Sequence, residues 1–315
     1  MNNKSVLVTG GAGFIGHNLC SALLARGCRV YAVDNLITGR IKNIEPLLKN
    51  KKFHFFKLDI TKPKFKKIFS HIPLKQIYHL ACPTGVPNIQ KFAQEMALVN
   101  SLGTINVLEL ARMHKAQLLF SSSCEVYGEP KVFPQSESYC GYVDPIGPRS
   151  PYEEGKRFSE ALIVMYVKKY NLDARIIRIF NTYGPGMSLD DQRVIPQFLR
   201  SIVADESFII YGNGQQTRTF LYIDDLIKGF FLVMEKGKAG EIYNLGGRQQ
   251  VPIKKLANLV IKLNNYKNGV RFVPHFINDH NGRQPSLRKI KSLGWRQEIS
   301  LREGLKRMLI ENGLK

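Results

Sequence analysis

The sequence predicts an α/β protein with a doubly wound parallel sheet and a smaller C-terminal lobe. Two observations favour this fold class. Apolar, β-branched runs alternate with helical patterns through the first part of the chain, and a glycine-rich turn follows the first run directly. After about residue 181 this alternation gives way to turn-rich segments and short helical stretches. We therefore expect a Rossmann domain over residues 1–180 and a smaller lobe mainly over 181–315, with the chain free to cross between them.

The predicted strands are short runs rich in Val, Ile and aromatic residues. Helices are expected near 90–113 and 151–170, and shorter helices near 194–204, 252–264 and 300–313. Right-handed crossovers between parallel strands bring their carboxyl ends to one edge of the sheet, where open sheets bind ligands. The strands of this sheet are expected at 5–9, 29–33, 53–58, 76–80, 117–121 and 174–179.

A glycine-rich turn joins the first strand to the first helix. Its glycines fit the dinucleotide-binding fingerprint in two registers, which begin at Gly10 or Gly11 and share Gly13 and Gly16. Glycine permits the tight turn, the close approach of the pyrophosphate to the backbone, and the packing of helix on strand. The free amide groups at the helix N-terminus favour an anion. The sequence therefore predicts a bound dinucleotide.

The second strand ends at Asp34, close to the spacing of about 20 residues at which an acid binds the ribose diol in such folds. A carboxylate there repels a 2′-phosphate. We therefore expect the cofactor NAD rather than NADP.

Tyr152 and Lys156 predict a redox site. They lie four residues apart, so a helix places them on one face, one turn apart. A neighbouring cation favours the charged form of a phenol and lowers its pKa. Such a tyrosine takes the proton of a substrate hydroxyl while the cofactor takes the hydride.

The composition is that of a globular protein. The chain has 315 residues, of which 44% are hydrophobic and 23% charged. No run reaches the roughly 18 apolar residues of a membrane helix, and no signal peptide is evident before the first strand. The five cysteines are odd in number and lack paired metal spacing. We expect a reduced, cytoplasmic protein without structural disulfides or a metal site.

The formal net charge is +21, and lysines crowd the segment 42–75. Nucleic-acid binding is one interpretation of such a segment. However, the lysines alternate with residues such as Phe53, Phe65 and Phe69, which resemble core positions of a strand and a helix. We therefore expect a solvated basic face on an enzyme, with neither nucleic acid nor a membrane as partner.

The assembled motifs resemble the extended short-chain dehydrogenase/reductase family over nearly the whole chain. The resemblance includes the glycine turn, the run from Ser121 to Gly128, and the Tyr152/Lys156 pair. It implies that Tyr152 and Lys156 are catalytic and that Ser123 shares their hydrogen-bond network with the reacting sugar oxygen. It also implies that NAD contacts Gly10, Gly13, Phe14, Ile15, Gly16, Asp34, Asn35, Gly39, Asp59, Ile60, Leu80, Ala81, Asn100, Ser121, Tyr152 and Lys156.

A narrower resemblance is to UDP-glucuronic acid decarboxylases. The run Pro145-Ile146-Gly147-Pro148-Arg149, leading into Tyr152-Glu153-Glu154-Gly155-Lys156, carries it above all. It implies oxidation of UDP-glucuronate at C4, loss of carbon dioxide and re-reduction to UDP-xylose, with Glu125 acting on the C5 side. It also implies that Asn181, Arg193, Tyr211, Arg218 and Arg283 contact the nucleotide sugar.

Cys124 supports a second interpretation. Similar decarboxylases have serine at this position, whereas a cysteine beside glutamate resembles UDP-N-acetylglucosamine 5,6-dehydratases. A UDP-hexose dehydratase, with Cys124 and Glu125 as acid and base, or a 4-epimerase therefore stays open. A non-catalytic NAD-binding regulator is a third possibility, which has no use for Tyr152, Lys156 and Ser123 together. Relatives pair through two helices, so we also expect a homodimer formed by 90–113 and 151–170.

Overall fold

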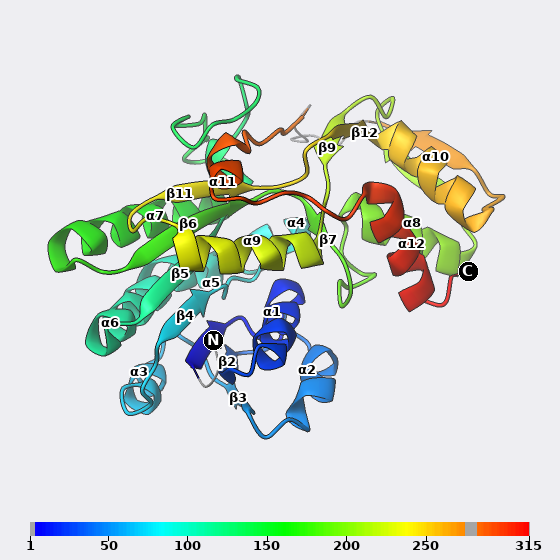
Figure 1. The fold of residues 1–315 in the computed structure, drawn as a ribbon. Coiled ribbons are helices and arrows are strands. Elements are labelled where there is room, and N and C mark those ends of the chain that lie inside the picture. The colour runs from blue at the N-terminus through cyan, green and yellow to red at the C-terminus, as the bar shows by residue number, and fades with distance from the viewer. Residues whose placement is uncertain (1–3, 275–281, 315) are drawn as a thin grey trace.

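A computed structural model describes residues 4–274 and 282–314. Within these ranges the main sheet has seven strands, all parallel, in the order β11-β6-β5-β4-β1-β2-β3 (Figure 1). This arrangement confirms the predicted doubly wound fold. The strands are β1 (Ser5–Thr9), β2 (Arg29–Asp34), β3 (Phe53–Lys57), β4 (Gln76–His79), β5 (Gln117–Ser123), β6 (Ala174–Ile179) and β11 (Ile242–Leu245).

Helices cover both faces of this sheet. Successive side chains of a strand point to opposite faces, so Val6 and Val8 of β1 belong to one hydrophobic core and Leu7 to the other. Helices α1 (Phe14–Ala25), α2 (Ile41–Leu48) and α9 (Ile223–Lys236) contribute to the first core. The second core lies under α3 (Pro63–Phe69), α6 (Thr104–His114) and α7 (Ser150–Tyr170).

The helix expected near 90–113 is interrupted. The structure has α4 (Val86–Lys91), α5 (Ala93–Leu98) and a π-helical turn η1 (Val99–Gly103) before α6. Phe92, with φ −125° and ψ 36°, separates α4 from α5. Within η1, the Ser159 hydroxyl of α7 donates to the Asn100 carbonyl at 2.6 Å, and this contact ties the turn to α7. Such π-turns are frequent at functional sites.

The C-terminal part of the chain is shared between two regions. Helix α9 and strand β11 return to the main sheet, so this sheet is not confined to residues 1–180. The remaining residues form paired short strands beside small helices, most of them at the right of Figure 1. The strands are β7 (Thr182–Tyr183), β8 (Phe208–Tyr211), β9 (Thr217–Thr219), β10 (Leu221–Tyr222), β12 (Gln250–Pro252) and β13 (Val270–Val273). The helices are α8 (Val194–Ala204), α10 (Ile253–Asn264), α11 (Arg288–Ser292) and α12 (Leu301–Glu311).

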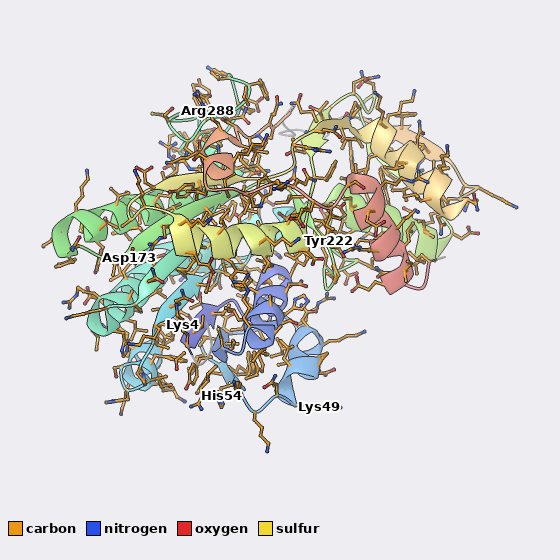
Figure 2. All side chains as sticks on the ribbon, viewed as in Figure 1. Lys4, Lys49, His54, Asp173, Tyr222 and Arg288 are labelled. Carbon is orange, nitrogen blue, oxygen red and sulfur yellow. The ribbon has the colours of Figure 1, made fainter. Side chains whose placement is uncertain are left out.

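The lysine-rich segment 42–75 forms the β3 edge of the sheet. Figure 2 shows Lys49 and His54 at this end of the molecule and Arg288 at the other. Phe65 and Phe69 are fully buried, whereas Lys64 and Lys67 are exposed, so the aromatic residues are core positions. Among the helices described, none combines the length and apolar character needed to cross a membrane.

Candidate active site

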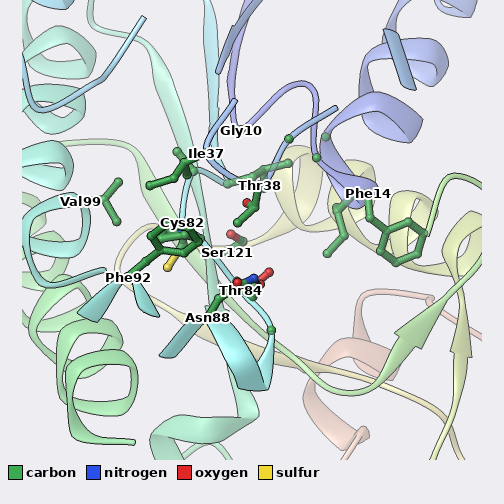
Figure 3. A pocket seen from close by; sticks show the side chains of 18 of the residues that line it. Gly10, Phe14, Ile37, Thr38, Cys82, Thr84, Asn88, Phe92, Val99 and Ser121 are labelled. Carbon is green, nitrogen blue, oxygen red and sulfur yellow. Dashed lines mark hydrogen bonds between the residues drawn. The ribbon is translucent and has the colours of Figure 1, made fainter. Parts of the chain in front are cut away.

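A cavity of about 1040 Å³ runs along the carboxyl ends of the sheet strands. Its walls come from the turns after β1, β2 and β4, the end of β5, the start of α7 and the loop after β6. Figure 3 labels lining residues from the turns after β1, β2 and β4, from α4 to η1 and from β5, gathered round the cavity. The position agrees with the rule that open parallel sheets bind ligands beyond their carboxyl ends.

The glycine turn brings backbone to the cavity without side chains. Gly10 has φ +72°, a left-handed conformation that favours glycine. A Cβ atom on Gly16 would lie 2.0 Å from the Gly10 carbonyl oxygen, so a larger residue would displace the turn. Helix α1 then begins at Phe14 without a side-chain cap or an acidic residue in its first turn. Its free amide groups therefore fit an anionic pyrophosphate.

Asp34 lies at the end of β2 and lines the same cavity. Its carboxylate accepts hydrogen bonds from the backbone N–H groups of Ala12 at 3.0 Å and Leu36 at 2.8 Å. A Cβ atom on Gly39 would lie 2.7 Å from both carboxylate oxygens, so glycine is needed beside it. The carboxylate retains acceptor capacity toward the cavity, as binding of a ribose diol requires.

Ser123, Tyr152 and Lys156 meet at the floor of the cavity. Ser123 ends β5, and its hydroxyl hydrogen-bonds the Tyr152 phenol. Lys156 is buried, and its ammonium group donates to the Ser121 carbonyl at 2.9 Å. Helix α7 thus holds Tyr152 and Lys156 on the face turned to the end of β5, as their spacing predicts.

The prediction that the neighbouring Lys156 lowers the pKa of Tyr152 is wrong for the structure of this chain. Burial is the largest influence and raises the pKa of the phenol well above its ordinary value, while the hydrogen bond with Ser123 opposes this only in part. Burial also lowers the pKa of Lys156, while Cys82 and Glu160 oppose this shift.

Glu125 is held by two arginines near Tyr152. Arg149 forms a short ion pair with its carboxylate and also contacts Glu153, from Nε to Oε1, at 2.9 Å. Arg283 donates from Nη2 to the same Glu125 carboxylate at 3.0 Å and from Nη1 to the Cys124 carbonyl. These groups place a charge-balanced cluster at one end of the cavity.

Cys124 contributes a protonated thiol to this cluster. Its side chain is only 4% exposed, and its sulfur lies 3.9 Å from the Glu125 carboxylate. Burial raises the pKa of Cys124 to about 11. The thiol therefore stays neutral near neutral pH.

Most of the predicted site residues line this one cavity, but four do not. Asn100 is buried behind it, and its amide points to Met96 O and Cys82 Sγ. Tyr211 and Arg218 lie on β8 and β9, and Arg283 reaches the site through Glu125. The lining residues are Gly10, Gly13, Phe14, Ile15, Gly16, Asp34, Asn35, Gly39, Asp59, Ile60, Leu80, Ala81, Ser121, Ser123, Cys124, Glu125, Tyr152, Lys156, Asn181 and Arg193.

Asn181 and Arg193 both border the cavity, but they differ in whether their side-chain donors have partners. The Asn181 amide nitrogen is buried without a hydrogen-bond partner among the described residues. A buried unpaired donor is costly, and a ligand acceptor would satisfy it. Arg193 is instead bound by Asp191, with its Nη2 at 2.6 Å from Oδ2.

Among the lining residues without a predicted role, two influence the proposed catalytic groups. Arg149 lies within the run quoted for the decarboxylase resemblance, and its spacing of four residues from Glu153 signals a charge pair on a helix. Cys82 follows β4, lines the cavity and adds to the raised pKa of Tyr152. Nothing in its local sequence indicates this proximity, because residues 82 and 152 meet only in the fold.

Comparison with known proteins places this chain in a family. A profile of the NAD dependent epimerase/dehydratase family matches residues 6–246. UDP-glucuronic acid decarboxylase 1 of Xenopus tropicalis is 38% identical over 309 residues, which are 98% of this chain and 72% of that protein. UDP-glucuronic acid decarboxylase 1 of Arabidopsis thaliana is 40% identical over 305 residues, which are 96% of this chain and 68% of that protein.

Two solved structures with folds similar to this chain are of UDP-sugar 4-epimerases. UDP-glucose 4-epimerase from Thermotoga maritima, with UDP-glucose, has a TM-score of 0.90 at 29% identity and covers 98% of both chains. UDP-glucuronic acid 4-epimerase from Bacillus cereus, in complex with UDP-glucuronic acid and NAD, has a TM-score of 0.87 at 29% identity, covering 98% of this chain and 99% of that one. The chain belongs to the NAD dependent epimerase/dehydratase family, within the extended short-chain dehydrogenases/reductases.

Proposed function

We propose that the protein is an NAD-dependent UDP-glucuronate decarboxylase. The proposal rests on the similarity to UDP-glucuronic acid decarboxylases, which extends over 96–98% of this chain. In the same chain, one cavity is lined by the glycine-rich turn and by Ser123, Tyr152 and Lys156. The Glu125 cluster adds an acid–base group where the sugar would lie.

The cofactor is NAD. The glycine turn would hold its pyrophosphate, Asp34 its adenosine ribose, and Lys156 its nicotinamide ribose, with Asp59 and Ile60 beside the adenine. When bound, NAD⁺ accepts hydride from C4 of the sugar and returns it at the end of the cycle, so the reaction has no net redox change.

Tyr152 would act as the base of the first step. Its phenolate accepts the proton of the C4 hydroxyl as that carbon is oxidised to a ketone. Ser123, which hydrogen-bonds the phenol, holds the same sugar oxygen from a second side. Burial raises the pKa of Tyr152, and the positively charged nicotinamide ring of bound NAD⁺ would oppose this by favouring the phenolate.

Loss of carbon dioxide follows from the position of the ketone. The C4 ketone is β to the C6 carboxylate, so the electrons of the C5–C6 bond flow into the carbonyl and form an enolate. Tyr152, now protonated, and Ser123 donate hydrogen bonds to the enolate oxygen. A proton from solvent is then added at C5, through a water that the Glu125 carboxylate would order. Re-reduction at C4, with Tyr152 returning its proton, gives UDP-xylose.

The nucleotide sugar would bind across both parts of the chain. The unpaired amide of Asn181 supports a role in substrate binding, because it lacks an acceptor among the described residues. Arg193 and Arg218 would bind the diphosphate, since guanidinium groups match its geometry. Tyr211 and Arg283 complete the proposed set, Arg283 through its contact with Glu125.

The Cys124–Glu125 contact favours a second candidate, a UDP-hexose dehydratase or 4-epimerase. A thiol that stays neutral can protonate a departing hydroxyl, and the adjacent carboxylate can take the C5 proton. A non-catalytic NAD-binding regulator is disfavoured, because it would not need the hydrogen-bonded Ser123 and Tyr152.

A homodimer would bury the apolar side chains that two helical segments expose. Leu98 and Leu102, before and within η1, are 40% and 44% exposed, and Phe158 and Met165 on α7 are 50% and 42% exposed. Helices with such faces pair in symmetric dimers. Light scattering of the purified protein would give twice the chain mass, and Phe158→Lys would give the monomer. Separately, we propose that the protein is cytoplasmic.

The function is tested by supplying UDP-glucuronate to the purified enzyme. We expect release of carbon dioxide and formation of UDP-xylose or its 4-keto precursor. Loss of water from UDP-N-acetylglucosamine, or inversion of a UDP-hexose without gas release, would instead establish the second candidate.

A further inference from the structure

Arg283 reaches Glu125 from a segment without regular secondary structure. Residues 282–286 form only isolated bridges to other parts of the chain. Nevertheless, the Arg283 side chain is only 3% exposed and contacts both Cys124 and Glu125. Something outside this segment must therefore fix the arginine, because an irregular chain does not hold a long side chain in one place.

Gln135 provides this support through both its backbone and its side chain. Its backbone N–H donates to Gln284 O at 2.8 Å, and its carbonyl accepts from Ser286 N at 2.7 Å. Its side-chain Oε1 accepts from Gln284 N at 2.8 Å, and its Nε2 donates to Val132 O at 2.6 Å. The residue directly after Arg283 is thus bound on both of its backbone polar groups by one buried glutamine.

Asn244 ties Gln135 to the main sheet. This fully buried residue of β11 donates from Nδ2 to Gln135 O at 3.0 Å. Its Oδ1 accepts from the Tyr127 hydroxyl at 2.7 Å, and its backbone N–H donates to Glu137 Oε1 at 2.8 Å. Tyr127 lies two residues after Glu125, so Asn244 connects the segment that carries Glu125 to the residue that supports the Arg283 segment.

We infer that Gln135 and Asn244 are positioning residues that hold Arg283 against Glu125. Neither lines the cavity. They act through Arg283, whose ion pair fixes the carboxylate that the proposed mechanism uses on the C5 side. The expected effect on kcat rests on the proposed function. The expected effect on the position of Arg283 does not.

The kinetic test replaces Gln135 by methionine, which keeps the length of the side chain but cannot accept the Gln284 N–H. We expect kcat to fall by about 10- to 100-fold, as displacement of a catalytic group by about 1 Å does. The affinity for NAD should not change, because the glycine turn is untouched. The matched control is Gln76→Met, at the opposite end of the sheet strands, where a buried glutamine donates to Gln117. It should leave kcat within about twofold.

A double substitution separates positioning from general damage. In an Arg283→Gln background, Gln135→Met should have no further effect on kcat, since the residue through which it acts is gone. Independent, multiplying effects of the two substitutions would overturn the inference.

A second readout does not depend on the reaction. Arg283 donates to the Cys124 carbonyl, so loosening Arg283 should expose the Cys124 thiol. Alkylation of Cys124 by iodoacetamide, followed by peptide mass spectrometry, should accelerate about tenfold in Gln135→Met and in Arg283→Gln but not in Gln76→Met. Unchanged labelling in Gln135→Met would reject the inference. Altered labelling without any decarboxylation by the wild type would reject the proposed function alone.

Discussion

The two ends of the cavity are built in different ways. The end proposed to bind the cofactor, called the cofactor end, comes largely from one continuous stretch, Gly10 to Gly39, in which backbone atoms and small residues set the shape. The end proposed to bind the sugar, called the sugar end, joins Cys124, Glu125, Arg149 and Arg283, from distant segments, through ion pairs and hydrogen bonds. Backbone geometry tolerates little change, whereas a side-chain cluster can be rebuilt one residue at a time. Proteins similar to this chain include one named UDP-glucuronic acid decarboxylase and one named UDP-glucose 4-epimerase.

Tyr152 lies where the two ends meet, so its replacement should have the largest effect. Tyr152→Phe removes the proton acceptor, and we expect kcat to fall by about 10²- to 10⁴-fold. Absorbance of the reduced nicotinamide and release of carbon dioxide should decline together. The control is Tyr166→Phe on the same helix, whose hydroxyl contacts Glu109 outside the cavity. A Tyr152→Phe enzyme with near-normal turnover would exclude the proposed mechanism.

Gly16→Ala should damage the cofactor end alone. Its Cβ atom would meet the Gly10 carbonyl at 2.0 Å, and relief of this clash must move the backbone of the turn. We expect NAD affinity to fall on the order of 100-fold, or about 2.7 kcal/mol, in a calorimetric titration. UDP should still bind with nearly unchanged affinity. Equal loss of both ligands would show that the two ends do not fold independently.

Cys124→Ser should affect the sugar end only slightly. A decarboxylase does not need an acid at this position, so we expect kcat to stay within about threefold of the wild type. A dehydratase that uses the thiol to protonate a departing hydroxyl would instead slow by about 10²-fold or more. Steady-state assays with both substrates therefore decide between the two candidate functions.

His79 should affect stability rather than chemistry. It is fully buried beneath the cofactor end, between Thr9 and Thr104, and burial lowers its pKa to about 3. The unfolded chain binds a proton below about pH 6.5, whereas the folded chain does not, so stability is lost as pH falls. This residue alone should lower the free energy of unfolding by about 1.4 kcal/mol per pH unit between pH 6 and 4. Urea denaturation should show a shallower pH dependence for His79→Gln than for the wild type.

The difference between the two ends of the cavity also explains which features could be predicted from the sequence. The strand Ser5–Thr9, the glycine turn and Asp34 follow from local patterns, and the structure has them at the expected positions. Strand β11 was not predicted, because its four residues are defined by pairing with β6 rather than by their own pattern. Helix α9 was also missed, although Ile223, Leu226, Ile227, Phe230 and Phe231 recur with the period of an amphipathic helix.

The contacts at the sugar end were harder to predict from the sequence, because they join residues that are far apart in the chain. The direction of the Tyr152 pKa shift was wrong, since the spacing to Lys156 shows the cation but not the burial that outweighs it. The link from Arg283 to Glu125 likewise joins residues far apart in the chain. Such contacts depend on how the C-terminal segment packs, which no local periodicity encodes.

The most direct test of the account is product analysis by mass spectrometry after incubation with UDP-glucuronate, UDP-N-acetylglucosamine and UDP-glucose in parallel. The account predicts that UDP-glucuronate alone loses the mass of carbon dioxide, and that Tyr152→Phe abolishes this loss. Unchanged UDP-glucuronate beside dehydrated or epimerised product from another sugar would contradict it.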